Sequence, residues 1–244
     1  MPVPSLVLFD LDETLVDHGH ASRTALAHLR TRHEALARLS SDEIEIRSRQ
    51  ILIDVHDKVL SGTLTPAQAR LERLRSLFDG CGLSPSDDFL DRTATEYGQI
   101  YRKAQGPSPG AVELLETLGR HPEVNHVAIL TNHLRDVQID KLEACGLTDL
   151  VDFMVTSEEV GHRKPSGQIF QFALGRAGTS AADAVMVGDS WEGDVQGAQA
   201  AGLRAVWFNA RDETAPVDSL EGAPVPELRS FKPLELACRV ILSR

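Results

Sequence analysis

Acidic, hydroxyl and amine side chains follow short apolar runs at several points of this chain. They are the types that serve in acid–base, nucleophilic and metal-ion chemistry. These residues are Asp10 and Asp12 after the first run, Thr131 and Asn132 after the second, Lys164 beyond the third, and Asp189 and Asp194 after the fourth. Two carboxylates about 4 Å apart repel each other by about 4 kcal/mol at an effective dielectric constant of about 20. If the fold gathers these acids, the cluster must hold protons or a cation.

Mg²⁺ is the cation that suits such a cluster, because it prefers hard carboxylate oxygens, keeps several waters and bridges to substrate phosphate. A divalent ion beside Lys164 would turn an acidic pocket into a phosphate site. Each residue alone also has a structural interpretation. Asp12 could cap a helix, Asp189 could form a capping pair with Glu192, and Lys164 could be solvated. Those interpretations do not explain why all of these side chains follow predicted strands.

The apolar runs predict the strands of a parallel sheet that is buried on both faces. They lie at residues 5–9, 126–130, 150–156, 184–188 and 204–209. Helical patterns separate or follow them at residues 111–120, 134–145, 168–177, 194–201 and 233–242. This alternation predicts an open, Rossmann-like α/β sheet, whose ligands bind beyond the carboxyl ends of the strands. The polar stretch 209–228 predicts an irregular surface segment.

Residues 20–105 interrupt the alternation and predict four helices without a strand. Start signals support three of them: Ser40 with Glu43, Thr65 with Pro66 and Gln68, and Ser84 with Pro85. We therefore expect an α/β core of residues 1–16 and 107–244, interrupted by a helical insert of residues 17–106.

The composition limits the classes of partner that this 244-residue chain is expected to bind. Its formal net charge of −11 argues against a nucleic-acid polymer or an anionic membrane surface as the main partner. Three cysteines without metal-ligand spacing, and no apolar run long enough to span a bilayer, predict a cytoplasmic protein. A small anionic substrate stays compatible with this charge, and the sequence leaves a homodimer open.

Taken together, four segments resemble the motifs of the haloacid dehalogenase superfamily, in the subclass with an α-helical cap. They are FDLDETL, ILTN, RKP and VGDSWEGD, and their order and spacing match across the core. The resemblance implies a Mg²⁺-dependent phosphatase that acts on a small phosphomonoester through an aspartyl-phosphate. It also implies that the α/β core is catalytic and that the helical insert of residues 17–106 is a cap domain. The acid at Asp12 favours phosphoryl transfer, because the dehalogenases that named the superfamily lack an acid at this position.

The resemblance also implies roles for the acidic residues. Asp10 would be the nucleophile, and Asp12 would act as general acid and then as general base. Asp10, Asp189 and the main-chain carbonyl of Asp12 would hold Mg²⁺, and Asp194 would support Lys164 or a metal-bound water.

The same resemblance implies that the remaining motif residues bind the phosphate. Lys164 would shield the nucleophile and the phosphoryl oxygens. Thr131 would donate its hydroxyl, joined by backbone N–H groups near Leu11 and Asn132.

The substrate stays open at this point. Segments of the core resemble two branches of the superfamily, the pyrimidine 5′-nucleotidases and N-acylneuraminate-9-phosphatase, so a nucleoside 5′-monophosphate is the first expectation. A sugar phosphatase or a phosphomutase is the alternative, and a phospho-accepting signalling module is a remote one. In this subclass the cap sets specificity, and candidates to contact substrate include His18, His20, Arg23 and Arg47.

Overall fold

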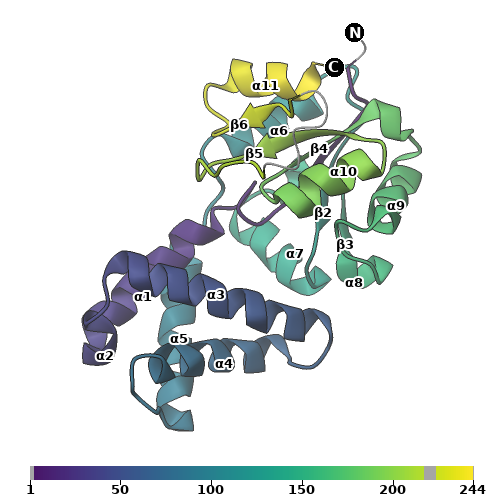
Figure 1. Cartoon of the computed structure of the whole chain (residues 1–244). Helices are drawn as coiled ribbons and strands as arrows, with labels where there is room; N and C mark the ends of the chain where they lie inside the picture. The colour runs from purple at the N-terminus through teal and green to yellow at the C-terminus, as the bar shows by residue number, and fades with distance from the viewer. Residues whose placement is uncertain (1–2, 217–223, 244) are drawn as a thin grey trace. The chain divides into compact units, whose positions relative to one another are not determined.

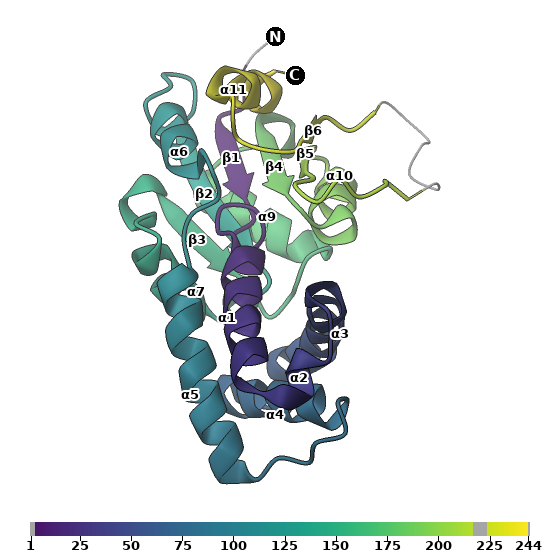
Figure 2. The same ribbon diagram turned by 90° about the vertical axis from the view of Figure 1, so that its left-hand side faces the viewer.

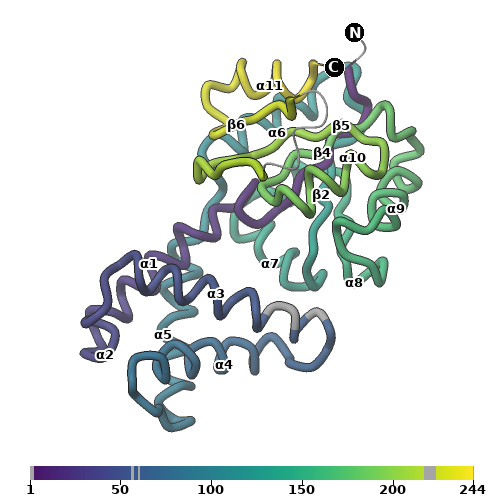
Figure 3. The backbone as a smooth tube through the Cα atoms, viewed as in Figure 1, coloured from purple at the N-terminus to yellow at the C-terminus, as the bar shows by residue number. Residues whose placement is uncertain are grey.

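The computed structural model describes the backbone of residues 3–216 and 224–243, and their side chains except those of residues 56, 57 and 60. The chain divides into two compact units (Figure 1). Unit 1 consists of Met1–Asp17 and Gly106–Arg244, and unit 2 consists of His18–Gln105. The backbone trace leaves unit 1 after its first strand and returns before its first helix (Figure 3). Unit 2 is therefore an insertion in the sequence of unit 1.

Unit 1 is built on a six-stranded parallel sheet in the order β3-β2-β1-β4-β5-β6 (Figure 2). The strands are β1 (Leu6–Phe9), β2 (His126–Thr131), β3 (Phe153–Thr156), β4 (Ala184–Gly188), β5 (Arg204–Phe208) and β6 (Glu227–Leu228). Because β1 lies between β2 and β4, the strand order reverses beside it. The carboxyl end of β1 is thus the point at which an open α/β sheet binds ligands.

Alternate residues of β1 enter two different cores, as the two-residue period of a strand requires. Val7 and Phe9 pack in a core with α6 (Ala111–Gly119), α7 (Arg135–Ala144) and α11 (Leu234–Leu242). Leu6 and Leu8 pack in a second core with α9 (Gly167–Ala177) and α10 (Gly197–Ala200). All four β1 side chains are fully buried, which explains their uninterrupted apolar run. The predicted Rossmann-like α/β core is confirmed.

Short helical turns complete unit 1 beside the strand ends. They are η1 (Thr148–Leu150), α8 (Ser157–Val160), η2 (Ala181–Asp183) and the π-helical turn η3 (Trp191–Gln196). The helix expected at residues 194–201 is therefore divided between η3 and α10. The strand expected to begin at residue 150 begins at Phe153, because η1 occupies the residues before it.

Unit 2 contains only helices among its described residues: α1 (His18–Arg32), α2 (Glu34–Ala37), α3 (Ser41–Leu60), α4 (Pro66–Asp79) and α5 (Asp87–Ala104). Their core includes Leu29, Ile44, Leu77, Phe78 and Leu90. The expectation of four helices was wrong by one, because the single turn α2 interrupts the connection between α1 and α3. That unit 2 acts as a cap domain stays a prediction.

Two of the three predicted helix starts are confirmed. The hydroxyl of Ser40 accepts from the Glu43 amide at 3.1 Å, and the Glu43 carboxylate accepts from the Ser40 amide at 2.8 Å. Thr65 forms the same reciprocal box with Gln68. The predicted start at Ser84 was wrong, because Ser86 caps α5 and accepts from the Phe89 amide. Two acidic residues, Asp87 and Asp88, then occupy the first turn, where the helix dipole favours them.

The segment 209–228 is not wholly irregular, since Glu227 and Leu228 pair in parallel with β5 as β6. Leu228 is buried in the core, which stabilises this short strand. Residues 217–223 of the predicted segment lie outside the described residues. Along the described chain, every helix is too short or too polar to cross a lipid bilayer.

The two chain segments at the boundary of unit 1 run antiparallel beside each other. Val16 forms an antiparallel bridge with Pro107, and the Ser108 amide donates to the Leu15 carbonyl at 2.8 Å. The Asp17 amide donates to the Gly106 carbonyl at 3.2 Å. The last residues before the insertion are therefore tied to the first residues after it.

Candidate active site

Three neighbouring strands of unit 1 deliver the predicted site residues to one edge of the sheet. Asp10 directly follows β1, Thr131 is the last residue of β2, and Asp189 directly follows β4. Lys164 comes from the loop between α8 and α9. Since β2, β1 and β4 are adjacent and parallel, their carboxyl ends bring these side chains together, as the sequence predicts.

Lys164 is the cation at the centre of this group. Its Nζ lies 2.6 Å from Asp10 Oδ1 and 2.6 Å from Asp194 Oδ1, and it donates to the Leu130 carbonyl at 2.6 Å. The Lys164 side chain is 3% exposed, so the ammonium has exchanged water for two carboxylates and a carbonyl. Asp194 is held from its other side by the Ser190 amide, which donates to Oδ2 at 3.0 Å. Lys164 and Asp194 therefore fix one side of Asp10.

The carboxylates of this group carry more negative charge than the surrounding cations offset. Burial raises the pKa of Asp10 from 3.8 to about 7, and the charge of Asp194 adds to this against the opposing effect of Lys164. Burial and then the Asp10 charge raise the pKa of Asp189 well above its ordinary value. Burial disfavours the charged form of Lys164, but Asp10 and Asp194 outweigh it and raise the Lys164 pKa. Without a further cation, the two strand-end acids hold protons more tightly than exposed acids do.

Asp12, whose charge also contributes to the raised pKa of Asp10, has a lysine of its own. Lys141 Nζ donates to Asp12 Oδ1 at 2.6 Å and to Oδ2 at 2.7 Å. Gln138 Nε2 donates to Asp12 Oδ2 at 3.0 Å. The Asp12 side chain remains 26% exposed, so it is both held and open to solvent. Both partners come from α7, and the sequence analysis assigned neither of them a role.

Thr131 and Asn132 lie at the end of β2 with separate tasks. Thr131 Oγ1 accepts from Gln138 Nε2 at 2.7 Å, so its own hydroxyl proton can be donated elsewhere. The Asn132 side chain accepts from the Lys164 amide at 2.7 Å and donates to the Lys164 carbonyl at 2.9 Å. Asn132 therefore fastens the Lys164 loop to the sheet through the backbone of Lys164.

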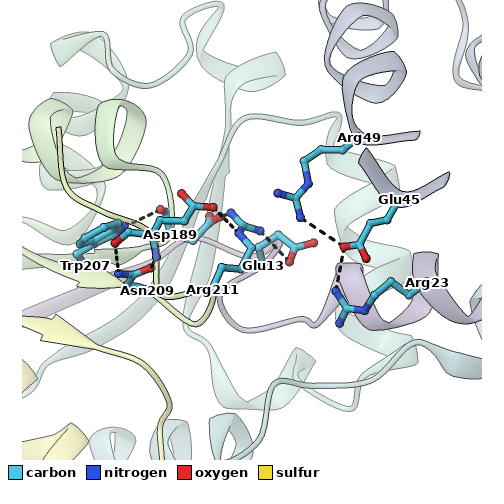
Figure 4. A network of polar contacts seen from close by, with 9 residues as sticks. Glu13, Arg23, Glu45, Arg49, Asp189, Trp207, Asn209 and Arg211 are labelled. Carbon is cyan, nitrogen blue, oxygen red and sulfur yellow. Dashed lines mark hydrogen bonds and ion pairs between the residues drawn. The ribbon is translucent and has the colours of Figure 1, made fainter. Parts of the chain in front are cut away.

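Arg211, from the segment after β5, is a further residue that the sequence analysis missed. Its guanidinium donates to Asp189 Oδ2 at 2.8 Å and lies 3.2 Å from Glu13 Oε2 (Figure 4). Trp207 also donates its indole N–H to the Asp189 carbonyl at 2.9 Å. Asp189 is thus oriented through both its side chain and its backbone. Arg211 lies in a polar stretch with no apolar period, so only the fold reveals its partner.

Glu13 adopts a left-handed backbone conformation with a φ of 61°, which is uncommon for residues other than glycine. The Glu13 amide donates to the Val16 carbonyl at 2.9 Å, and the Val16 amide donates to the Leu11 carbonyl at 2.9 Å. These bonds close a tight turn directly after Asp12. The ion pair with Arg211 then joins this turn to Asp189.

The residues present fit a hard divalent cation. Carboxylate oxygens of Asp10, Asp189 and Asp194 all lie within 4.8 Å of one another. Three carboxylates meet at one edge of the sheet, and those of Asp10 and Asp194 are buried. Such hard oxygen ligands are the ones that Mg²⁺ prefers. Asp194 is engaged by Lys164 and by the Ser190 amide, so Asp10 and Asp189 are the members better placed as direct ligands.

Mg²⁺ binding should strengthen as the pH rises through about 7. The folded-state pKa of Asp10 is about 7 against an ordinary 3.8, so between these values the folded protein binds a proton that the unfolded chain releases. Metal-free stability therefore falls as the pH rises through this window, and Mg²⁺ must displace that proton at low pH. The Mg²⁺-induced rise in Tm should be larger at about pH 8 than at about pH 6. An equal rise at both pH values would contradict this assignment of Asp10.

Three of the four substrate-contact candidates, His18, Arg23 and Arg47, have partners within unit 2. His18 Nδ1 lies 2.5 Å from the Tyr101 hydroxyl, and Arg47 donates to the Gly80 carbonyl at 2.9 Å. Arg23 and Arg49 both contact Glu45, at 3.4 Å and 3.5 Å (Figure 4). Contact of His18, His20, Arg23 or Arg47 with substrate stays a prediction.

Comparison with known proteins shows the family to which this chain belongs. The family model for haloacid dehalogenase-like hydrolases matches residues 4–202. Ribulose-1,5-bisphosphate 5-phosphatase of Halopiger xanaduensis is 33% identical over 217 residues, which cover 89% of this chain and 90% of that protein. Pyrimidine 5′-nucleotidase YjjG of Escherichia coli is 40% identical over 136 residues, or 54% of this chain and 57% of that protein. Human N-acylneuraminate-9-phosphatase is 26% identical over 238 residues, covering 94% of this chain and 91% of that protein.

Solved structures agree on the fold. The HAD hydrolase YfnB of Bacillus subtilis, in a magnesium-bound crystal form, superposes with a TM-score of 0.72 at 22% identity, covering 98% of this chain and 99% of that one. The family model covers most of the chain, and the Halopiger phosphatase matches across nearly its whole length. The chain therefore belongs to the haloacid dehalogenase-like hydrolase family, as an enzyme of the phosphatase type.

Proposed function

We propose that this protein is a Mg²⁺-dependent phosphomonoesterase in which Asp10 becomes phosphorylated and Asp12 transfers protons. The observation that carries the proposal is the difference in surroundings between two aspartates that are only two residues apart in the sequence. Asp10 is buried against Lys164 beside Asp189 and Asp194, whereas Asp12 is paired with Lys141 and remains partly exposed. One carboxylate thus has the surroundings of a shielded nucleophile, and the other those of an accessible acid and base.

In the first step, a carboxylate oxygen of Asp10 attacks phosphorus and forms the aspartyl-phosphate. The ester P–O bond breaks, its electron pair leaves with the ester oxygen, and Asp12 supplies the proton that completes the alcohol. Lys164, 2.6 Å from Asp10, shields the negative charge of the nucleophile from that of the phosphate. The Thr131 hydroxyl and backbone N–H groups near Leu11 and Asn132 would donate to the phosphoryl oxygens.

In the second step, water attacks the phosphorus of the aspartyl-phosphate. Asp12 takes a proton from that water, and the P–O bond to Asp10 breaks so that its electron pair returns to the carboxylate. Inorganic phosphate leaves, and the proton on Asp12 is available for the next leaving group. The overall change is one water consumed and one alcohol and one phosphate released.

Asp10, Asp189 and the main-chain carbonyl of Asp12 would hold the Mg²⁺ ion in this proposal. Bound there, the ion supplies electrostatic stabilisation of charge on the transferring phosphoryl group. Asp194 would keep Lys164 in place, and Arg211 would orient Asp189 through the contact at 2.8 Å.

The substrate class is a small phosphorylated metabolite, and a nucleoside 5′-monophosphate is the first candidate. The 40% identity with a pyrimidine 5′-nucleotidase supports it. The long match with ribulose-1,5-bisphosphate 5-phosphatase and the match with N-acylneuraminate-9-phosphatase support a sugar phosphate as the second candidate. A phosphomutase would use the same residues but deliver the phosphoryl group to a sugar hydroxyl instead of water.

Removal of the metal should abolish turnover. With Mg²⁺ we expect phosphate release from a panel of nucleoside monophosphates, sugar phosphates and acyl-sugar phosphates, ranked by kcat/KM. Excess chelator should lower the rate by at least about 100-fold because the acidic cluster then repels the substrate phosphate, and added Mg²⁺ should restore it. The proposal fails if folded, Mg²⁺-loaded protein releases no phosphate, or if chelation leaves the rate unchanged. Isomerisation of a hexose phosphate without phosphate release would identify a mutase.

A further inference from the structure

We propose that Lys141 and Gln138, one turn apart on α7, are positioning residues that hold the Asp12 carboxylate for its proton transfer with water. This inference rests on the proposed phosphatase function and deepens it. Both residues lie outside the four motif segments FDLDETL, ILTN, RKP and VGDSWEGD. Both act through Asp12, and neither needs to touch the reacting atoms.

The contacts hold the Asp12 carboxylate in one orientation. Three N–H···O contacts, at 2.6, 2.7 and 3.0 Å, reach its two oxygens from the same helix. A carboxylate that accepts hydrogen bonds at both of its oxygens cannot rotate without breaking charge-assisted hydrogen bonds. The Asp12 side chain is 26% exposed, so solvent reaches the carboxylate.

The holders themselves are fixed by the core. Residues three apart on a helix lie on one face, so Gln138 and Lys141 reach Asp12 together. Gln138 is fully buried, and Leu142, beside Lys141 in the sequence, is a member of the core cluster on this face of the sheet. The Lys141 side chain is only 12% exposed, which is unusual for lysine and indicates a specific partner.

Gln138 couples Asp12 to the phosphate-binding threonine. Its amide nitrogen donates to both Asp12 Oδ2 and Thr131 Oγ1, while its carbonyl oxygen is buried with no partner among the described side chains. The reverse orientation of the amide would place its oxygen against the Asp12 carboxylate, so the charges favour the orientation observed. One side chain thereby sets the distance between the proton-transfer group and the residue that would bind the phosphoryl oxygens.

Loss of these holders should slow the hydrolysis of the aspartyl-phosphate most. In that step the attacking water forms a bond to phosphorus, its proton passes to Asp12, and the broken P–O bond returns its electron pair to Asp10. A carboxylate that is free to rotate is correctly placed in fewer encounters, so proton removal becomes slower. With 4-nitrophenyl phosphate the first step needs little proton donation, because 4-nitrophenolate is a stable leaving group.

Pre-steady-state release of 4-nitrophenolate, measured with Mg²⁺, tests the inference. For Lys141→Met we expect the burst rate constant to stay within about threefold of wild type while steady-state kcat falls about 10- to 100-fold. KM should fall together with kcat, because the covalent intermediate accumulates, and kcat/KM should change little. Gln138→Leu should show the same pattern more weakly, because the Lys141 contacts remain.

Three further variants separate positioning from loss of structure. Lys141→Arg keeps two charged donors and should restore part of kcat. Lys232→Met removes a lysine that is 61% exposed, 3.5 Å from Glu113, and should leave every rate unchanged. In an Asp12→Asn background, Lys141→Met should cause no further loss, because the group through which it acts is already absent.

The possible outcomes are distinct. If wild type turns over and Lys141→Met retains its kcat, or loses kcat/KM without a fall in KM, the positioning role is overturned. Multiplying losses in the Asp12→Asn background would also overturn it, since they would show an effect independent of Asp12. If wild type itself releases no 4-nitrophenolate with Mg²⁺, the proposed function fails instead.

Discussion

Asp10→Asn should reduce phosphatase turnover by at least about 10⁴-fold, because an amide oxygen cannot replace a carboxylate as the attacking group. The substitution keeps the shape of the side chain and removes a buried charge, whose desolvation raises the pKa of Asp10 to about 7. We therefore expect the folded protein to keep its Tm within a few degrees, with Lys164 still paired to Asp194. Steady-state phosphate release and a thermal melt measure the two effects.

Wild-type turnover in a fresh Asp10→Asn preparation would show that Asp10 is not the nucleophile. A large fall in Tm would contradict the expected stability of the variant, because the lost rate could then come from unfolding. Asp88, in the first turn of α5, offers a matched control, since it lies on the surface of unit 2. Asp88→Asn should leave the turnover rate within about twofold of wild type, and should change stability by less than about 1 kcal/mol.

Lys164→Met should damage both activity and stability. It leaves two buried carboxylates, Asp10 and Asp194, without the ammonium that lies 2.6 Å from each. Breaking a buried ion pair by removing one partner costs about 3–5 kcal/mol, so the urea midpoint should fall markedly. Turnover should fall by about 100-fold or more, because the repulsion between Asp10 and the substrate phosphate is no longer shielded.

Mg²⁺ offers an internal check on Lys164→Met. A divalent cation restores part of the missing positive charge, so Mg²⁺ should raise the Tm of the variant by more than it raises that of wild type. The surface variant Lys232→Met should change neither the urea midpoint nor the Mg²⁺ response. An unchanged urea midpoint for Lys164→Met would show that the ion pairs of Lys164 with Asp10 and Asp194 do not stabilise the fold.

The strands and the motif residues were predictable because their signals are local. Leu6–Phe9 is buried on both faces and therefore reads as an uninterrupted apolar run, and Asp10 follows it directly. Thr131 and Asp189 likewise end or follow apolar runs. A parallel sheet then brings its carboxyl ends together, so the gathering of these residues follows from the fold class alone.

The missed residues have signals that are not local. Lys141 and Gln138 lie within an ordinary polar helical pattern, and only the packing of α7 shows that they face Asp12, 129 and 126 positions away in the sequence. Arg211 lies 22 residues from Asp189 in a polar stretch, without a periodic pattern. Lysine, arginine and glutamine are mostly solvated, so residue type alone could not distinguish these three from the others.

Errors at element boundaries also have physical causes. Ser84 and Ser86 are both followed by plausible first turns, and the two aspartates after Ser86 decide in favour of the later start. β6 has only two residues, and the core burial of Leu228 stabilises it more than any strand pattern could indicate.

The formation of a phosphorylated Asp10 is the central claim, and reductive trapping tests it most directly. Enzyme mixed with substrate and Mg²⁺ is quenched in acid, treated with borohydride, digested and analysed by mass spectrometry. Borohydride reduces an aspartyl-phosphate to homoserine, so we predict homoserine at position 10 of the wild-type chain and none in protein quenched without substrate. Homoserine at Asp12 or Asp189, or its absence from wild-type and Lys141→Met enzymes during active turnover, would contradict the account.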